Sequence, residues 1–148
     1  MSADNKRNTQ ELVSLNRPAS ATWRVMVVDD ERDNLEVITR LLQFLGSTVI
    51  TAENGVEALK KLQTEKPTFI LSDLLMPEMD GWKLFQSIRK DATTARIPII
   101  AVTASTMTVD ARSAMAYGFD GFIAKPFSIS TFITEIQRCL DSVKQSAV

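Results

Sequence analysis

The stretch Val25–Glu31 has the sequence VMVVDDE and decides the fold class of this chain. Four consecutive apolar residues, three of them β-branched, are typical of a strand that is buried on both faces of a parallel sheet. Three acidic residues follow at once, so the predicted strand ends in a cluster of negative charge. Three later strand-like runs also end close to a polar or charged residue; these residues are Asp73, Thr103 and Lys125.

Strands and helices are predicted to alternate along the chain from Arg24 onward. The predicted strands are Arg24–Val28, Ser47–Ala52, Thr68–Ser72, Ile97–Val102 and Phe119–Ile123. Apolar residues at helical spacing predict five helices. The first ends at Gly46 and the second starts at Asn54; the other three cover Trp82–Lys90, Thr108–Tyr117 and the region after Ser128. Five such units imply an α/β fold with a five-stranded parallel sheet and helices on both faces. The expected strand order is the flavodoxin-like 2-1-3-4-5.

Capping and packing patterns refine the helices. Asn54 and Glu57 resemble an N-terminal capping pair. Phe127 is expected to pack on Phe132 at the start of the C-terminal helix. The predicted buried stripe of that helix is Ile129, Phe132, Ile133, Ile136 and Leu140.

Composition excludes several classes of protein. The chain has 148 residues, a formal net charge of −1, one cysteine and no histidine. It therefore has no internal disulfide, no phosphohistidine and no histidine-ligated metal, and its charge argues against direct nucleic-acid binding. No apolar run approaches the roughly 18 residues of a membrane span, and a cytoplasmic location is expected. Residues 1–22 are predicted to form a flexible N-terminal extension, and residues 23–145 a single domain.

The residues that follow the strands are expected to meet at one edge of the sheet. Ligands of such sheets bind at the carboxyl ends of the strands, at the point where the strand order reverses. Asp29, Asp30 and Glu31 follow the first strand and Asp73 follows the third, so their carboxylates would repel one another without a cation. Mg²⁺ is the expected ion, because it binds few carboxylates and then accepts phosphate oxygens.

These residue types together favour phosphoryl transfer. Asp73 is the candidate nucleophile, since a carboxylate can attack phosphorus and form an acyl phosphate. Lys125 would supply positive charge, and the Thr103 hydroxyl could donate to a phosphoryl oxygen. A cis bond between Lys125 and Pro126 would direct the lysine across the edge of the sheet.

The ordered set of motifs closely resembles the receiver domain of bacterial two-component response regulators, of the chemotaxis-regulator type. The resemblance covers residues 23–143. The matching stretches are Val25–Glu31 (VMVVDDE), Asn54–Leu59 (NGVEAL), Ile70–Gly81 (ILSDLLMPEMDG), Ile97–Ala104 (IPIIAVTA) and Gly118–Phe127 (GFDGFIAKPF).

The resemblance implies a phosphorylation switch with Asp73 as the phosphoacceptor. It implies Mg²⁺ bound by Asp30, Asp73 and the backbone carbonyl of Leu75, with Asp29 helping without direct contact to the ion or through a water molecule. Thr103 would sense the phosphoryl group and Phe122 would respond to it. Output would then pass through the face made by the fourth helix, fifth strand and fifth helix.

Departures from the family pattern have consequences of their own. Phe119 stands where a small alanine is usual, so local packing is expected to differ. Leu75 and Ser105 occupy positions that tune water access to the acyl phosphate in the family. Neither offers a carboxylate or amide to orient water, so slow self-dephosphorylation is expected.

The leading function is a receiver that takes a phosphoryl group from a histidine kinase or phosphotransfer protein and signals by protein contact. It would catalyse only its own phosphorylation and dephosphorylation. The chain could be a stand-alone protein or part of a larger regulator or hybrid kinase, and phosphorylation-dependent homodimerisation is left open. The main alternative is a pseudo-receiver that acts only as an interaction module. A flavodoxin-like cofactor site is disfavoured by the three acids after the first strand, and a two-aspartate phosphatase by Leu75.

Overall fold

The computed structural model describes residues 19–104 and 111–146. Its centre is a five-stranded parallel sheet in the order β2-β1-β3-β4-β5, which confirms the predicted fold class and topology. All strand pairs are parallel. The strands are β1 (Arg24–Val28), β2 (Thr48–Ala52), β3 (Phe69–Ser72), β4 (Ile99–Ala104) and β5 (Gly121–Lys125).

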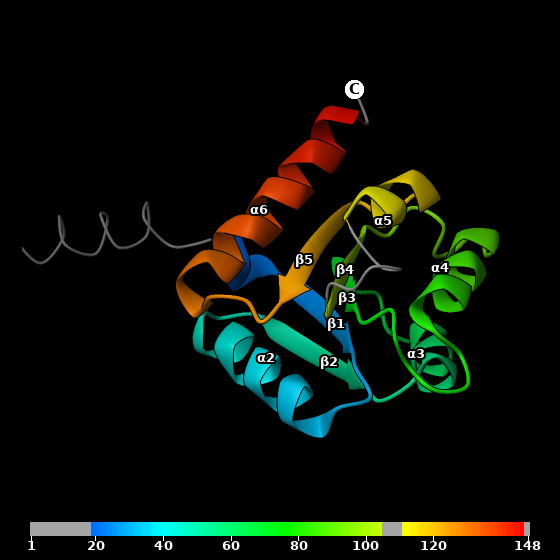
Figure 1. The fold of residues 1–148 in the computed structure, drawn as a ribbon, viewed down its shortest axis with the longest axis horizontal. Helices are drawn as coiled ribbons and strands as arrows, with labels where there is room; N and C mark the ends of the chain where they lie inside the picture. The colour runs from blue at the N-terminus through cyan, green and yellow to red at the C-terminus, as the bar shows by residue number, and fades with distance from the viewer. Residues whose placement is uncertain (1–18, 105–110, 147–148) are drawn as a thin grey trace, which may run out of the picture.

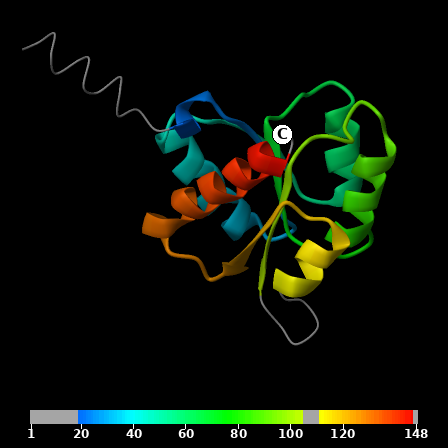
Figure 2. The same ribbon diagram turned by 90° about the horizontal axis from the view of Figure 1, so that it is seen from above.

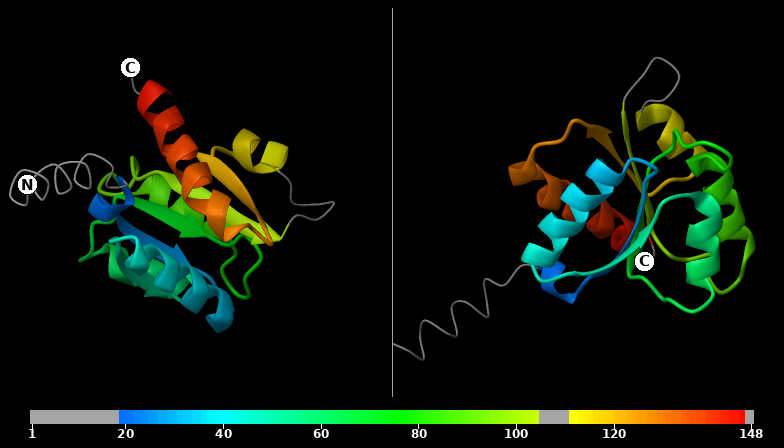
Figure 3. Two further views of the ribbon diagram at one scale, coloured as in Figure 1. Left: turned by 90° about the vertical axis from the view of Figure 1, so that its left-hand side faces the viewer. Right: turned by 90° about the horizontal axis from the view of Figure 1, so that it is seen from below.

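Helices cover both faces of the sheet (Figures 1 and 2). One face carries α2 and α6, and the other carries α3, α4 and α5, as the right-hand view of Figure 3 also shows. Each βαβ crossover can therefore bury the apolar side of its helix against the sheet. The helices are α2 (Arg32–Phe44), α3 (Gly55–Leu62), α4 (Gly81–Lys90), α5 (Ala111–Tyr117) and α6 (Ile129–Ser146).

Each face of the sheet has its own hydrophobic core. Leu35, Ile38 and Leu42 of α2 pack with Phe132 and Ile136 of α6 against alternate residues of the strands. The second core contains the inward side chains of α3, α4 and α5 and the remaining strand residues. Because side chains of a strand point alternately to its two faces, the central strands are buried throughout.

The last two strands begin and end two residues later than predicted. Ile97 and Pro98 belong to the connection before β4, where the Ile97 N–H donates to the Thr94 carbonyl in a turn. Phe119 precedes β5, because its N–H donates to the Ala114 carbonyl at the end of α5. A buried apolar run therefore marks a strand but not its ends, since connecting residues can be equally buried.

Predicted helix ends are largely confirmed. The Asn54 side chain accepts a hydrogen bond from the Glu57 N–H at 2.8 Å. Gly46 ends α2 with a φ of 94°, which glycine adopts without steric cost. Phe127 stacks on Phe132 with ring centroids 4.2 Å apart, as expected. Ile129 is a correction: as the first residue of α6 it is 62% exposed and does not join the buried stripe.

The segment before β1 packs on the turn between α2 and β2. Residues 19–22 form a short 3₁₀-helix, η1 (Ala19–Thr22), and Ser20 in it is fully buried. The Ser20 carbonyl accepts a hydrogen bond from the Ser47 hydroxyl at 2.5 Å. The flexible extension was predicted over residues 1–22; residues 1–18 lie outside the described residues, as do Ser105 and the start of the helix predicted from Thr108, whereas residues 19–22 are part of the packed structure. None of the helices in the described ranges has both the length and the hydrophobicity to cross a bilayer.

Candidate functional site

The strand order brings the ends of four strands together. Asp29 directly follows β1, and its N–H donates to the Ala52 carbonyl at 3.1 Å. Asp73 directly follows β3, and its N–H donates to the Val28 carbonyl at 2.9 Å. Thr103 and Lys125 lie at the ends of β4 and β5, which are paired in register. All four side chains therefore share the carboxyl edge of the sheet, at the point where the strand order reverses.

The Asp73 carboxylate receives three hydrogen bonds from the residues that the structure describes. Its Oδ1 accepts from the Thr103 hydroxyl at 2.6 Å and from the Leu75 N–H at 3.0 Å. Its Oδ2 accepts from Lys125 Nζ at 3.1 Å. Its side chain is only 8% exposed. These three hydrogen bonds orient the carboxylate. The Thr103 hydroxyl and Lys125 Nζ also lie close enough to contact a phosphoryl group added to it.

Lys125 also binds the second buried aspartate, Asp29. Its Nζ lies 2.7 Å from Asp29 Oδ2, and the other oxygen of Asp29 accepts from the Glu31 N–H at 2.9 Å. The peptide bond from Lys125 to Pro126 is cis. One ammonium group is thus shared by two carboxylates.

Burial and charge act against each other in this group. Burial raises the pKa of Asp29, and the hydrogen bonds from Lys125 and the Glu31 N–H offset only part of the effect, so the pKa stays above its ordinary value. For Lys125, burial lowers the pKa, but hydrogen bonds and charges from Asp29 and Asp73 together outweigh it, and the pKa is raised. Lys125 is therefore a cation at neutral pH.

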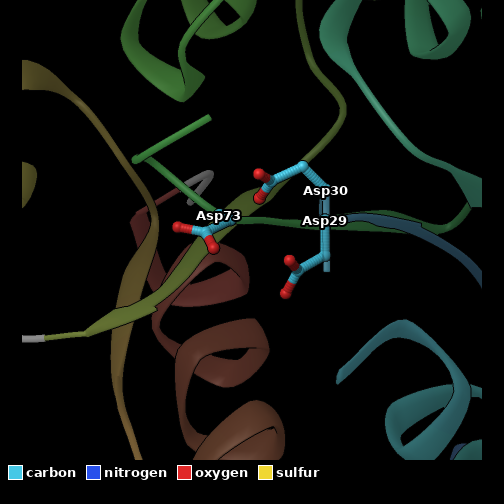
Figure 4. Close-up of side chains that lie close together, drawn as sticks. All are labelled: Asp29, Asp30 and Asp73. Atoms are coloured by element: carbon cyan, nitrogen blue, oxygen red, sulfur yellow. The ribbon is translucent and has the colours of Figure 1, made fainter. Parts of the chain in front are cut away.

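Asp30 completes an acidic cluster at the edge. One carboxylate oxygen from each of Asp29, Asp30 and Asp73 lies within 4.8 Å of the other two. Figure 4 shows the three side chains gathered beyond the ends of β1 and β3. Asp30 is exposed, whereas the other two are buried. Three carboxylates and one ammonium leave excess negative charge, and hard oxygen ligands of this kind fit a divalent cation such as Mg²⁺.

The loop after Asp73 is shaped by a close backbone approach. A Cβ at Gly81 would lie 2.3 Å from the Asp73 carbonyl oxygen, so no other residue fits there without moving Asp73. The Gly81 N–H donates to the Leu74 carbonyl at 3.0 Å. Asp80 then caps α4 by accepting from the Lys83 N–H at 2.9 Å. The start of α4 therefore helps to hold the Asp73 backbone in place.

A cavity of about 530 Å³ opens beside Asp73. Its lining comes from the first turns of α2 and α6 and from the ends of β3, β4 and β5. Apolar side chains, among them Leu75 and Ile129, make up part of it. The polar residues that line it are Glu31, Asn34, Asp73, Thr103 and Lys125.

The aromatic residue Phe122 lies in the middle of β5, beside Ala101 of β4. It is half-buried and packs against the core beneath α3, α4 and α5. The neighbouring Gly121 is in close contact with Cys139 of α6, where a Cβ would lie 2.2 Å from the sulfur.

Most of the predicted site residues come together in the structure. Asp29, Asp30, Asp73, Thr103 and Lys125 meet as expected. Two features were not predicted from the sequence: Lys125 is shared by two aspartates, and Asn34 lines the cavity. The position of Asn34, one helical turn after the acidic run, was the available signal.

The fold and the site together define an α/β domain with an acidic, lysine-containing centre at its switch point. The chain belongs to the response regulator receiver domain family, whose model matches residues 25–137. Members of this family are receiver domains of two-component signalling systems.

Sequence relatives agree with this assignment. A protein described as an uncharacterized 14.6 kDa protein of Leptolyngbya boryana is 35% identical over 81% of this chain and 92% of its own length. The probable transcriptional regulator ycf27 of Guillardia theta is 33% identical over 84% of this chain. The chain spans about half of the length of that regulator, 48%.

Solved structures show the same fold. The chemotaxis protein CheY4 of Vibrio cholerae is 32% identical, with a TM-score of 0.72 over 78% of this chain and 97% of that one. The receiver domain of a signal transduction histidine kinase from Syntrophus aciditrophicus is 30% identical, with a TM-score of 0.73 over 83% of this chain and 93% of that one.

Proposed function

We propose that this receiver domain is a phosphorylation-activated switch in which Asp73 accepts a phosphoryl group from a phosphohistidine on a histidine kinase or phosphotransfer protein. The observation that carries the proposal is the environment of Asp73. A hydroxyl, an ammonium group and two further carboxylates surround one buried carboxylate that borders an open cavity. The chain has no histidine, so a phosphohistidine must belong to a partner.

Mg²⁺ is the proposed cofactor. Asp30, Asp73 and the backbone carbonyl of Leu75 would hold it, and Asp29 would contribute through a water molecule. When bound, the ion would neutralise the carboxylates and offset the negative charge of an incoming phosphoryl group. Asp30 suits direct coordination because it is the exposed member of the cluster.

The residues of the chain have distinct parts in the transfer. The Asp73 carboxylate is the nucleophile. Lys125 already lies within reach of it and would stabilise charge on the transferred group. Thr103 already donates to Asp73 Oδ1, so its hydroxyl needs only a small movement to reach a phosphoryl oxygen on the same carboxylate. The chain would thus catalyse only its own phosphorylation and dephosphorylation.

The proposed output is a change in protein contacts. Movement of Thr103 toward a phosphoryl group would alter the packing near Phe122 of β5, whose register partner Ala101 lies two residues before Thr103 on β4. The surface formed by α5, β5 and α6 would then change its affinity for a downstream protein or for a second copy of the chain. The charge of the phosphoryl group would shift the equilibrium between two packings of this surface.

The acyl phosphate is expected to be long-lived. Leu75 lines the cavity beside Asp73, is 48% exposed, and cannot orient an attacking water. We expect Leu75→Asn to shorten the half-life of the labelled protein roughly tenfold, because an amide can position water. Val56→Asn, at an exposed site on α3, is the matched control. A half-life of only seconds in the unaltered protein would contradict the expectation.

Acetyl phosphate with Mg²⁺ tests the acceptor directly. Intact mass should show the addition of one phosphoryl group to the unaltered chain and to Asp91→Asn, an exposed control, and none to Asp73→Asn. Omission of Mg²⁺ should abolish labelling. Unchanged incorporation in Asp73→Asn would move the acceptor elsewhere. Absence of both labelling and any response to beryllofluoride would favour the interaction module instead.

A further inference from the structure

Glu31 and Asn34 form a polar pair on the wall of the cavity beside Asp73. Both residues line the cavity, and Asn34 Nδ2 donates a hydrogen bond to Glu31 Oε2. Asn34 is half-buried, so the pair is fixed on the helix side of the cavity. Neither residue belongs to the acidic cluster formed by Asp29, Asp30 and Asp73.

The Glu31 carboxylate makes neither a helix-capping hydrogen bond nor an ion pair among the described residues. Glu31 is the N-cap residue of α2, yet its side chain makes no capping hydrogen bond. Serine, threonine, aspartate and asparagine are favoured at that position because they do. Among the side chains that the structure describes, no lysine or arginine forms an ion pair with Glu31. A carboxylate next to a phosphoryl site would also repel phosphate, so its presence there needs another explanation.

The rest of the cavity suits a flat, partly apolar ring. Val37, Leu75 and Ile129 supply apolar lining and are each about half exposed or more, at 50%, 48% and 62%. Glu31 supplies a hydrogen-bond acceptor to the same space. An imidazole ring has apolar faces and, when protonated, an N–H on the nitrogen that does not carry the phosphoryl group. A carboxylate acceptor matches that N–H.

We propose that Glu31, held by Asn34, recognises the phosphoimidazole ring of the donor by accepting a hydrogen bond from its free N–H. The inference rests on the proposed function and deepens it, because it assigns a residue that selects phosphohistidine over acyl phosphate donors. Glu31 is a specificity-determining residue, and Asn34 is a positioning residue that acts through it.

The hydrogen bond favours the reactive form of the donor. An oxygen of Asp73 forms the new O–P bond while the N–P bond breaks, and the electron pair of the N–P bond goes to the ring nitrogen. A protonated ring then leaves as neutral imidazole and retains its other N–H. No proton is transferred to Glu31. An acyl phosphate donor leaves as a carboxylate, which has no N–H to offer and is repelled by Glu31.

The test compares two small donors, N-phosphoimidazole and acetyl phosphate, on the same full chain with Mg²⁺. The measured quantity is the ratio of their second-order labelling rates at Asp73. Glu31→Gln should lower the ratio of phosphoimidazole to acetyl phosphate roughly tenfold, as expected for loss of one charge-assisted hydrogen bond. Asn34→Leu should lower it roughly threefold, because Glu31 loses the partner that orients it.

Asp33→Asn is the matched control. It removes one negative charge from the same turn of α2, is exposed, and does not line the cavity. Its ratio should equal that of the unaltered chain. The proposal is overturned if Glu31→Gln leaves the ratio unchanged, if both donors slow equally, or if Asp33→Asn lowers the ratio as much. Failure of the unaltered chain to label at Asp73 with either donor would instead refute the proposed function, and this inference with it.

Discussion

At the residue scale, Lys125 is the side chain on which the unphosphorylated site depends. It is 14% exposed and binds two aspartates that are 3% and 8% exposed. Removal of one partner from a buried charged group leaves the others uncompensated, which costs more than the intact group contributes. The same lysine therefore supports the fold before phosphorylation and is proposed to stabilise charge during transfer.

We expect Lys125→Met to lower the free energy of unfolding by about 2–4 kcal/mol at pH 7.5 without divalent metal. The loss should shrink at pH 4.5, because burial already raises the pKa of Asp29, removal of the lysine raises it further, and protonation relieves the unpaired negative charge. Urea unfolding of the unaltered chain and the variant at pH 7.5 and pH 4.5 measures the loss of stability at each pH. Lys60→Met, at an exposed site on α3, is the control and should change stability little. An equal loss at both pH values would contradict this account.

The raised pKa of Lys125 has a consequence at alkaline pH. A folded-state pKa above the ordinary value of 10.5 means that the folded protein holds the proton more tightly than the unfolded chain. The associated stability is fully present below pH 10.5 and is lost as the pH rises through the folded-state pKa. The difference in stability between the unaltered chain and Lys125→Met should therefore narrow above that pH.

At the element scale, the loop between β3 and α4 shows how a connection positions a site. Glu78 has a φ of 66°, in the left-handed region that L-residues rarely adopt. Two residues later Asp80 caps α4, and Gly81 approaches the Asp73 carbonyl. The loop thus contains an unfavourable backbone conformation at Glu78, and at its end Gly81 contacts the backbone of Asp73, the proposed nucleophile.

Glu78→Gly should raise the free energy of unfolding by about 0.5–1 kcal/mol, because glycine adopts a positive φ without a Cβ clash. Thermal or urea unfolding measures the gain. Gln86→Gly, at an exposed position inside α4, should have the opposite sign and cost about 1 kcal/mol. A loss of stability in Glu78→Gly would show that its side chain contributes more than its backbone conformation costs.

At the scale of the whole molecule, an aromatic cluster joins α4 to the end of α5 and to the connection between α5 and β5. Phe119 is 2% exposed, and its ring lies 4.5 Å from that of Phe85 and 5.5 Å from that of Trp82. Tyr117 adds an edge-on contact to Trp82 at 4.8 Å. The large residue at position 119 thus fills space between two helices.

Phe119→Ala should destabilise the protein by about 3 kcal/mol, since it leaves a cavity in the core beneath α4 and α5. Phe44→Ala removes the same group from a site that is 86% exposed and should have little effect. Chemical unfolding of both variants provides the comparison. A loss below about 1 kcal/mol for Phe119→Ala would mean that the neighbouring rings close the gap.

Local patterns along the chain were enough to predict the strands, the helices, their parallel order and the edge at which Asp29, Asp30, Asp73, Thr103 and Lys125 gather. This succeeded because the period of apolar residues follows the geometry of each element, and because connection handedness leaves few topologies. Strand ends in β4 and β5 were misplaced by two residues, because burial in a connection looks like burial in a strand.

Which distant side chains pair with one another was decided only by the tertiary structure. Lys125 is separated by 96 residues from Asp29 and by 52 from Asp73, and no local pattern states which of them it binds. Exposure of Ile129 and the pairing of Glu31 with Asn34 beside Asp73 depend on how α2 and α6 meet the sheet. Contacts between distant segments depend on the angles and distances at which helices and strands pack. The residue types of one segment by themselves do not determine those angles and distances.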